Sequence, residues 1–370
     1  MSEYQYYEFQ AIDRTLTREE QAELRACSSR ARISATHFVN EYHWGNLKGD
    51  PMEWMEKYFD AHVYLSNFGS RSLVFRFPLA WIDPEMIWPY EVEGALEIQK
   101  SGSHLILSLM LDTEPGEHDD EDDVTGILSS LVAIRAALAS GDTRALYLGW
   151  LSAVQYGLVD GGSEEPPVPH GLNAADNALE CLAGFLHVSD DLLKAAAKLS
   201  IGDVLKPAAS DVAAWLAALG PAEKDRWLSK ILQEDDSSAV REIRRLFLAS
   251  SRPPEKTPRF ARSVDELLAA AEDIERQRLD EERKDADEAR QQYLRSLIGR
   301  ESELWKSVIK LSESSSERYQ DSSVRILTDL RDLAGLIDAT GAFQEKLEGL
   351  IELRRRKSSY MRRLEQAGFL

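Results

Sequence analysis

The chain has few of the residues and motifs that usually reveal a chemistry. Its 370 residues include only two cysteines, Cys27 and Cys181. Neither has a cysteine or histidine neighbour at metal-ligand spacing, so we interpret both as free thiols in a reducing compartment. The sequence lacks the GxxxxGK[ST], GxSxG and HExxH motifs, and no GxGxxG follows a strand. We therefore expect no cofactor and name no catalytic residue.

Long apolar runs are also absent. No stretch approaches the roughly 18 consecutive apolar residues of a transmembrane helix. The first residues, M-S-E-Y-Q-Y-Y-E-F, lack the basic and apolar regions of a signal peptide. These features predict a cytoplasmic protein without membrane contact.

Charge is unevenly distributed along the chain. The total is 44 Lys and Arg against 64 Asp and Glu, a net charge of -20. Residues 1–125 account for -14, residues 126–253 for -4 and residues 254–370 for -2. An acidic surface repels phosphate backbones and anionic lipid, which argues against nucleic acid or a membrane as the partner of the front half. It suits a basic protein surface, or it simply keeps the protein in solution.

The first 124 residues alternate between strand and helix patterns. Alternating apolar residues predict strands at 4–12, 36–44 and 73–77, and helices are expected at 17–30 and 51–67. A strand pair at 95–99 and 104–111 follows, joined across 100–103. We expect a small α+β sandwich over 1–124, ending in the acidic seam 112–123, which contains Pro115-Gly116 and has no hydrophobic period.

The remainder of the chain is predicted to be helical. Residues 125–251 carry seven helix patterns, at 124–139, 143–159, 173–187, 189–199, 204–219, 222–233 and 237–249, whose short links indicate helical hairpins. A Pro-rich linker at 250–258 spans the start of the third segment, 252–370. That segment opens with a capping box at Ser263 and Glu266, continues as a long helix that is polar on all sides over 275–292, and ends in helices at 319–338, 342–356 and 359–367. The fold class is therefore α+β, with a predominantly α-helical hairpin or solenoid-like array after the sandwich.

Two stretches carry a resemblance to known proteins. The C-terminal helices, R-Y-Q-D-S-S-V-R-I-L-T-D-L-R-D-L-A (318–334) and A-F-Q-E-K-L-E-G-L-I-E-L-R-R-R-K-S-S-Y-M-R-R-L-E-Q-A-G-F-L (342–370), resemble those of uncharacterised bacterial proteins associated with SWIM zinc fingers. The stretch E-Y-H-W-G-N-L-K-G-D (41–50) resembles the start of an uncharacterised bacterial family. The CxC and CxH ligands of a SWIM finger are absent, so the resemblance implies no zinc site and supplies no activity.

The best metal candidates surround the second predicted strand. His37, Glu41 and His43 share a strand face, and His62 is expected on the following helix. Six extended residues span about 20 Å, too far for His37 and His43 to bind one ion. Only Glu41 and His43, with a residue such as His62, remain feasible, and an ordinary polar strand face is the favoured interpretation. The run 118–123 lacks the spacing of a calcium-binding loop.

Two groups of residues are candidates for partner binding. Trp44 and Trp54 flank the turn at 45–50, where aromatic residues usually form a core but can also anchor a partner peptide. The second group is a basic cluster made of Arg354, Arg355, Arg356, Lys357, Arg362 and Arg363. Its cations fit a helix C-terminus, an acidic docking partner or, least of all, nucleic acid. The acidic front and this cluster can also meet, within one chain or between copies in a homo-oligomer.

These patterns favour a non-enzymatic adaptor or scaffold that binds protein partners in a bacterial multi-protein system. One alternative is an enzyme whose site lies in the N-terminal domain or an inter-domain cleft and uses His37, Glu41, His43, Asp60 or His62. A second is a nucleic-acid-associated factor that acts through the Arg-rich C-terminal helices.

Overall fold

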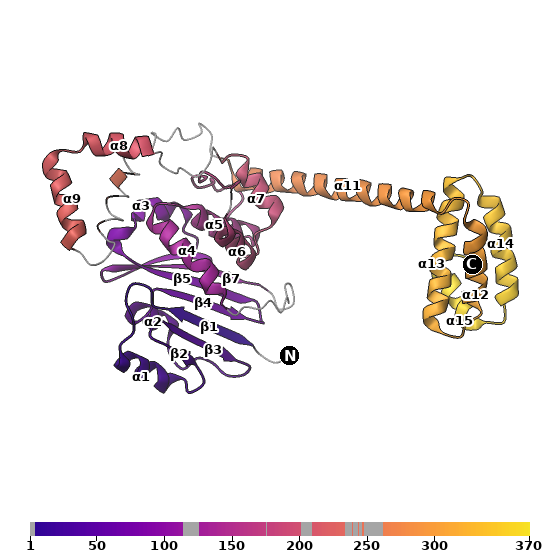
Figure 1. Ribbon diagram of the computed structural model, residues 1–370, viewed down its shortest axis with the longest axis horizontal. Coiled ribbons are helices and arrows are strands. Elements are labelled where there is room, and N and C mark those ends of the chain that lie inside the picture. The colour runs from indigo at the N-terminus through magenta and orange to yellow at the C-terminus, as the bar shows by residue number, and fades with distance from the viewer. Residues whose placement is uncertain are drawn as a thin grey trace. The chain divides into compact units, whose positions relative to one another are not determined.

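The computed structural model describes residues 4–113, 126–174, 176–200, 209–233 and 262–370, with a few isolated positions between 239 and 247. Its contacts divide the chain into two compact units, residues 1–275 (the N-terminal unit) and 276–370 (the C-terminal unit). The fold class is α+β, as predicted, with a sheet and covering helices in the first unit and helices alone in the second (Figure 1).

A seven-stranded antiparallel sheet organises the N-terminal unit. The strand order is β2-β3-β1-β4-β5-β7-β6. The strands are β1 (Gln5–Gln10), β2 (Arg32–Ile33), β3 (His37–Tyr42), β4 (Ala61–Ser66), β5 (Ser70–Pro78), β6 (Leu96–Ser101) and β7 (His104–Asp112). The expected pairing of the last two strands is confirmed, with Leu107 opposite Ile98.

Residues 61–66 correct one expectation. The helix predicted over 51–67 is wrong in its second half, because α2 (Pro51–Lys57) is followed by the strand β4. In A-H-V-Y-L-S the period is two: Ala61, Val63 and Leu65 join the larger core, while His62 and Tyr64 point to the opposite face. Pairing with both β1 and β5 places this strand in the interior of the sheet.

Helices from the middle of the chain cover one face of the sheet. They are α4 (Ile127–Ala139), α5 (Arg144–Gln155), α6 (Asn177–Phe185) and α7 (Asp190–Ala197). Their apolar residues and those of the sheet form one continuous core. A Cβ atom on Gly149 of α5 would lie only 2.4 Å from Leu109 of β7, so this glycine permits close helix–sheet packing. The contacts therefore place the sheet and these helices in one unit, a different division from the separate 1–124 and 125–251 segments expected.

The opposite face carries a smaller core under α1 (Arg18–Cys27) and α2, which includes Phe9, Phe38 and Met55. Thr17 and Glu20 cap α1 reciprocally, through Thr17 Oγ1 and the Glu20 carboxylate. One short helix, α3 (Pro84–Ile87), lies between two 3₁₀ turns at Leu79–Trp81 and Trp88–Tyr90.

Two further helices are α8 (Ala209–Ala218) and α9 (Pro221–Gln233). Three expectations fall wholly or mostly outside the described residues: the acidic seam beyond Thr113, the helix at 237–249 and the linker at 250–258.

The long helix α11 (Val264–Ser296) begins inside the N-terminal unit. The predicted capping box is present, since Ser263 Oγ accepts from Glu266 N–H and the Glu266 carboxylate accepts from Ser263 N–H. Val264 and Leu267 are fully buried in the larger core. From 279 to 289 every residue of α11 is exposed, which matches the predicted polar stretch.

Four complete helices and the end of α11 make up the C-terminal unit. The end of α11 is followed by α12 (Glu301–Ser312), α13 (Glu317–Leu336), α14 (Thr340–Arg354) and α15 (Ser358–Gln366). The last three helices agree with the predicted ones. Helix α13 contacts α12, α14 and α15, so the unit is a small bundle with Leu327, Leu347 and Tyr360 in its own core. Among the described residues, no helix is both long and apolar enough to cross a lipid bilayer.

We predict that a cut within the exposed part of α11 leaves two folded fragments, 1–286 and 287–370. Each keeps its complete core, so each should unfold cooperatively in urea as monitored by circular dichroism. A chain ending at Ser251 should instead be destabilised by at least about 3 kcal/mol. It loses the apolar side chains of Val264 and Leu267 and also Arg262, which forms a buried ion pair with Glu165. Equal stability of fragments 1–251 and 1–286 would contradict this assignment of the start of α11.

Candidate functional site

The structure does not bring the candidate metal ligands together. His43 is exposed just after β3, and its ring contacts Tyr4 at 5.5 Å between centroids. Glu41 forms an exposed ion pair with Arg32 at 3.6 Å. His62 lies in the smaller core on the other face of the sheet from Glu41. Across the described ranges, no three His, Cys, Asp or Glu side chains are grouped so that they could hold a metal ion.

His62 is a core residue on β4 rather than a helical ligand. It is 2% exposed, stacks on Phe9 with 3.8 Å between ring centroids and has Nδ1 2.9 Å from the backbone oxygen of Glu8. Burial lowers the pKa of this imidazole to about 4, and the bond to Glu8 opposes the shift only in part. The ring is therefore neutral at pH 7.

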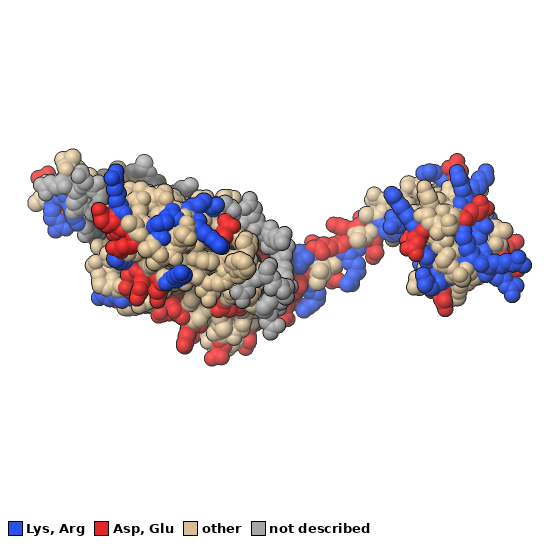
Figure 2. Space-filling view, turned by 90° about the horizontal axis from the view of Figure 1, so that it is seen from below, with Lys and Arg blue, Asp and Glu red and all other residues tan. Residues whose placement is uncertain are grey.

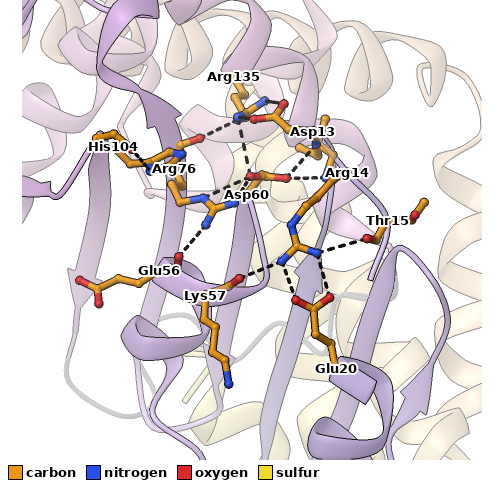
Figure 3. Close-up of polar contacts among 12 residues, drawn as sticks. Asp13, Arg14, Thr15, Glu20, Glu56, Lys57, Asp60, Arg76, His104 and Arg135 are labelled. Carbon is orange, nitrogen blue, oxygen red and sulfur yellow. Dashed lines mark hydrogen bonds and ion pairs between the residues drawn. The ribbon is translucent and has the colours of Figure 1, made fainter. Parts of the chain in front are cut away.

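Asp60 is the centre of a buried ion network (Figure 3). Its side chain lies 1% exposed at the entrance to β4. Oδ2 accepts from the N–H groups of Ile12 and Asp13 at 2.7 and 2.8 Å, and Oδ1 accepts from Arg76 Nη2 at 2.7 Å. Arg135 of α4 adds a bidentate pair to Asp13 at 2.6 and 3.0 Å and donates to the backbone oxygen of Arg76 at 2.9 Å.

The charges in this network satisfy one another. Burial alone would raise the pKa of Asp60, but the N–H groups of Asp13 and Ile12 and the Arg76 guanidinium hold it below its usual range. The Arg135 guanidinium also lies 5.2–5.3 Å from the rings of Phe77 and Trp81. This arrangement fastens α4 to the sheet and leaves Asp60 fully engaged, so we assign it a structural role.

A second buried network fastens the start of α11. Arg262 donates to the Glu165 carboxylate at 2.7 and 2.8 Å, and the Tyr147 hydroxyl donates to the same carboxylate. Burial and the neighbouring carboxylate of Glu165 raise the pKa of Tyr147 far above its usual value. The segment around Glu165 and the start of α11 also pair through their backbones, since Val264 N–H donates to Ser163 O at 3.0 Å.

One cavity of about 490 Å³ lies between α4 and the N-terminal ends of α5 and α6. Its apolar lining includes Ile134 and Leu179. The buried charge on its wall, Arg144, binds Asp142 at 2.7 Å and the backbone oxygen of Ala174 at 3.1 Å. That guanidinium is thus already engaged in holding the loops between these helices.

Trp44 is the exposed aromatic residue that the sequence pattern singled out, with 73% of its surface accessible. The turn that follows it is held by Gln5 of β1, whose Nε2 donates to Gly45 O at 3.2 Å and to Asn46 Oδ1 at 3.0 Å. Gln5 is itself buried, and its Oε1 accepts from the Tyr7 hydroxyl at 2.8 Å. An exposed indole on a firmly held turn is suited to partner recognition.

The prediction that Trp54 is a candidate for partner binding is wrong. It is 6% exposed and packs against Phe9 and Phe38 with centroid distances of 5.3 and 4.9 Å. Gly49 lies directly on the indole, where a Cβ atom would approach the ring to 2.3 Å. Because α2 turns this face toward the sheet, Trp54 belongs to the core and is not accessible to a partner.

The basic cluster divides into two sets. Arg354 and Lys357 bind the C-terminal end of α12, with Arg354 Nη2 2.9 Å from Ile309 O and Lys357 Nζ 3.0 Å from Ser312 O. Arg363 Nε pairs with Asp321 of α13 at 2.7 Å. These three residues hold the bundle together. The helix-terminus interpretation fits Arg354 and Lys357, although the helix concerned is α12 rather than their own, whereas Arg363 forms an ion pair with a side chain of α13.

The second set, Arg355, Arg356 and Arg362, is exposed. Arg355 makes a weak surface pair with Glu352 at 3.6 Å, in which both side chains are 75% accessible. Lys and Arg side chains gather on one side of the C-terminal unit in Figure 2. The sequence did not separate these two sets, because Arg354 ends α14 and Lys357 precedes α15, so no helical period relates them.

No family model, curated protein or solved structure matches this chain. The resemblance of the C-terminal helices to bacterial SWIM-associated proteins therefore stays a prediction.

We predict that Asp60→Asn destabilises the protein by about 3–5 kcal/mol, because Arg76 and Arg135 remain buried with reduced compensation. Urea unfolding followed by fluorescence or circular dichroism measures the change. Glu41→Gln, which removes one partner of an exposed ion pair, should change the free energy of unfolding by about 0.5 kcal/mol or less. Similar effects of the two substitutions would contradict the structural role of Asp60.

We also predict a pH dependence of stability that originates at His62. The unfolded chain binds a proton near pH 6.5 while the folded protein resists protonation down to about pH 4, so stability falls as pH decreases across this window. The loss attributable to His62 should approach about 3 kcal/mol at the lower end. His62→Phe keeps a ring against Phe9 and should flatten the wild-type slope between pH 6.5 and 5. An unchanged slope in urea unfolding would show that another group is responsible.

Proposed function

We propose that this chain is a non-enzymatic adaptor that binds different protein partners through its N-terminal and C-terminal units. The observation that carries the proposal is the exposure of every residue of α11 from 279 to 289, a stretch that in sequence follows the last residue of the larger core and precedes the first core residue of the bundle. A helix that is polar on all sides gains no stability from burial, so its sequence position between two cores favours a connecting role.

The buried ionisable groups support the same interpretation. Asp60, Glu165 and His62, which would be the natural candidates for acid–base chemistry, are each committed to internal contacts. A catalytic group needs access to a substrate as well as a shifted pKa. In the described part of the chain these three side chains hold elements in place.

Each unit also offers side chains suited to a protein partner. The N-terminal unit exposes Trp44, a residue type enriched among those that dominate binding energy. The C-terminal unit exposes Arg355, Arg356 and Arg362, which steer and orient an acidic partner. Two chemically different surfaces on separate units favour two different partners.

An affinity capture from native cells, read by mass spectrometry, tests the proposal with three tagged baits: the full chain, fragment 1–286 and fragment 287–370. Each fragment should retain its own set of proteins, and the full chain should retain both sets in one complex that co-elutes by size. The proposal fails if one fragment retains nothing that the full chain retains.

Charge-reversed baits give this capture a matched control. Arg355→Glu with Arg356→Glu should remove the proteins held by fragment 287–370. Arg318→Glu with Arg325→Glu makes the same charge change at exposed positions of α13 and should leave them bound. Equal losses from both pairs would indicate nonspecific attraction rather than a defined surface.

A further inference from the structure

Three segments that are distant in sequence meet at one end of the sheet. Strand pairing places Gln5 of β1 opposite Tyr42 of β3 and opposite Ser66 of β4. The residue before Gln5 is Tyr4, so it lies between the ends of β3 and β4. Its ring contacts His43 at 5.5 Å on one side, and its backbone oxygen accepts from Asn67 N–H at 3.0 Å on the other.

The next residues outward on either side of Tyr4 are both exposed and aromatic. Trp44 follows His43 and is 73% accessible, and Phe68 follows Asn67 and is 37% accessible. Tyr4, His43, Trp44 and Phe68 thus bring four aromatic side chains to this end of β1, β3 and β4, and we name these residues the Trp44 surface. In Figure 1 this end of the sheet lies beside the N-terminal mark.

The backbone beneath the Trp44 surface is fixed before any partner arrives. The buried Gln5 amide holds the Gly45–Asn46 turn, and its oxygen receives the Tyr7 and Tyr64 hydroxyls at 2.8 and 3.3 Å. On the other flank, Tyr4 N–H donates to Asn67 Oδ1 at 2.8 Å. Such pre-organisation reduces the entropy lost on binding and makes exposed rings more effective anchors.

The charge of the N-terminal unit indicates which partners this surface attracts. Residues 1–275 contain 25 Lys and Arg against 46 Asp and Glu, whereas residues 276–370 contain 19 against 18. At the same end of the sheet, the exposed Asp112 ends β7 opposite Ser70 of β5, two residues after Phe68. Acidic partners are repelled by such a unit and basic ones are drawn to it.

Aromatic rings and basic side chains are also complementary at contact distance. An Arg or Lys cation over an indole face is attracted by the negative face of the ring, and tryptophan is the strongest aromatic partner for it. We propose that the Trp44 surface binds an Arg- or Lys-bearing segment of a partner protein, with a basic side chain stacked on Trp44 and its apolar neighbours against Phe68. This assignment rests on the adaptor function and names the partner chemistry for the N-terminal unit.

A phage-displayed library of short random peptides, selected on the immobilised full-length protein, tests the assignment without a known partner. Wild-type protein should enrich peptides that contain Arg or Lys beside an apolar residue. The Trp44→Ala variant should lose this enrichment, and a selected peptide should bind it about tenfold or more weakly than wild type. Raising the salt concentration should weaken wild-type binding.

Trp88→Ala is the matched control, because Trp88 is 55% exposed but belongs to the 3₁₀ turn at Trp88–Tyr90 and not to the ends of β1, β3 and β4. It should bind the selected peptides like wild type, as long as circular dichroism shows all three proteins folded. Enrichment of acidic or purely apolar peptides, or equal affinity of the wild-type and Trp44→Ala proteins, would overturn the assignment. Neither result bears on the capture by fragments 1–286 and 287–370, so that capture tests the adaptor function independently of this assignment.

Discussion

The Asp60 carboxylate lies where a backbone loop, a strand and a helix converge, and their relative positions depend on its charge. Its donors come from the loop after β1 and from Arg76 of β5, and Arg135 of α4 closes the network through Asp13. Arg76 also donates to Glu56 O near the end of α2 at 2.7 Å. Since α2 and α4 cover opposite faces of the sheet, one buried anion couples both layers. Such a charge stabilises the fold only while every partner stays in place.

Local signals in the sequence were sufficient for much of the secondary structure. The capping box at Ser263 needs only residues three apart and forms as predicted, and Thr17 and Glu20 form a second one. The strand at 61–66 was missed because Asp50-Pro51 marks a strong helix start and nothing marks its end after Lys57. The packing of α4 and α5 onto the sheet depends on contacts between residues far apart in sequence, which no local period encodes.

The candidate surfaces were predictable by residue type but not by accessibility. Trp44 and Trp54 are ten positions apart and similar in context, yet one is exposed and the other is covered by Phe9 and Phe38. The difference comes from which face α2 turns to the sheet and from the turn that Gln5 holds. Likewise, within the basic cluster only the residues that reach α12 or α13 bind a neighbouring helix, and no local pattern shows which helices are neighbours.

The segment that holds the start of α11 also fixes both ends of one long interval of the chain. Residue 200 and residue 262 are both tied to the same segment: the Ser200 hydroxyl donates to Pro169 O at 2.8 Å, and Arg262 binds Glu165. The two ends of the interval 201–261 are therefore both held by residues 165–169 of the same unit. A change at Arg262 would therefore release one end of this interval, whereas a change of length within it leaves both attachments in place.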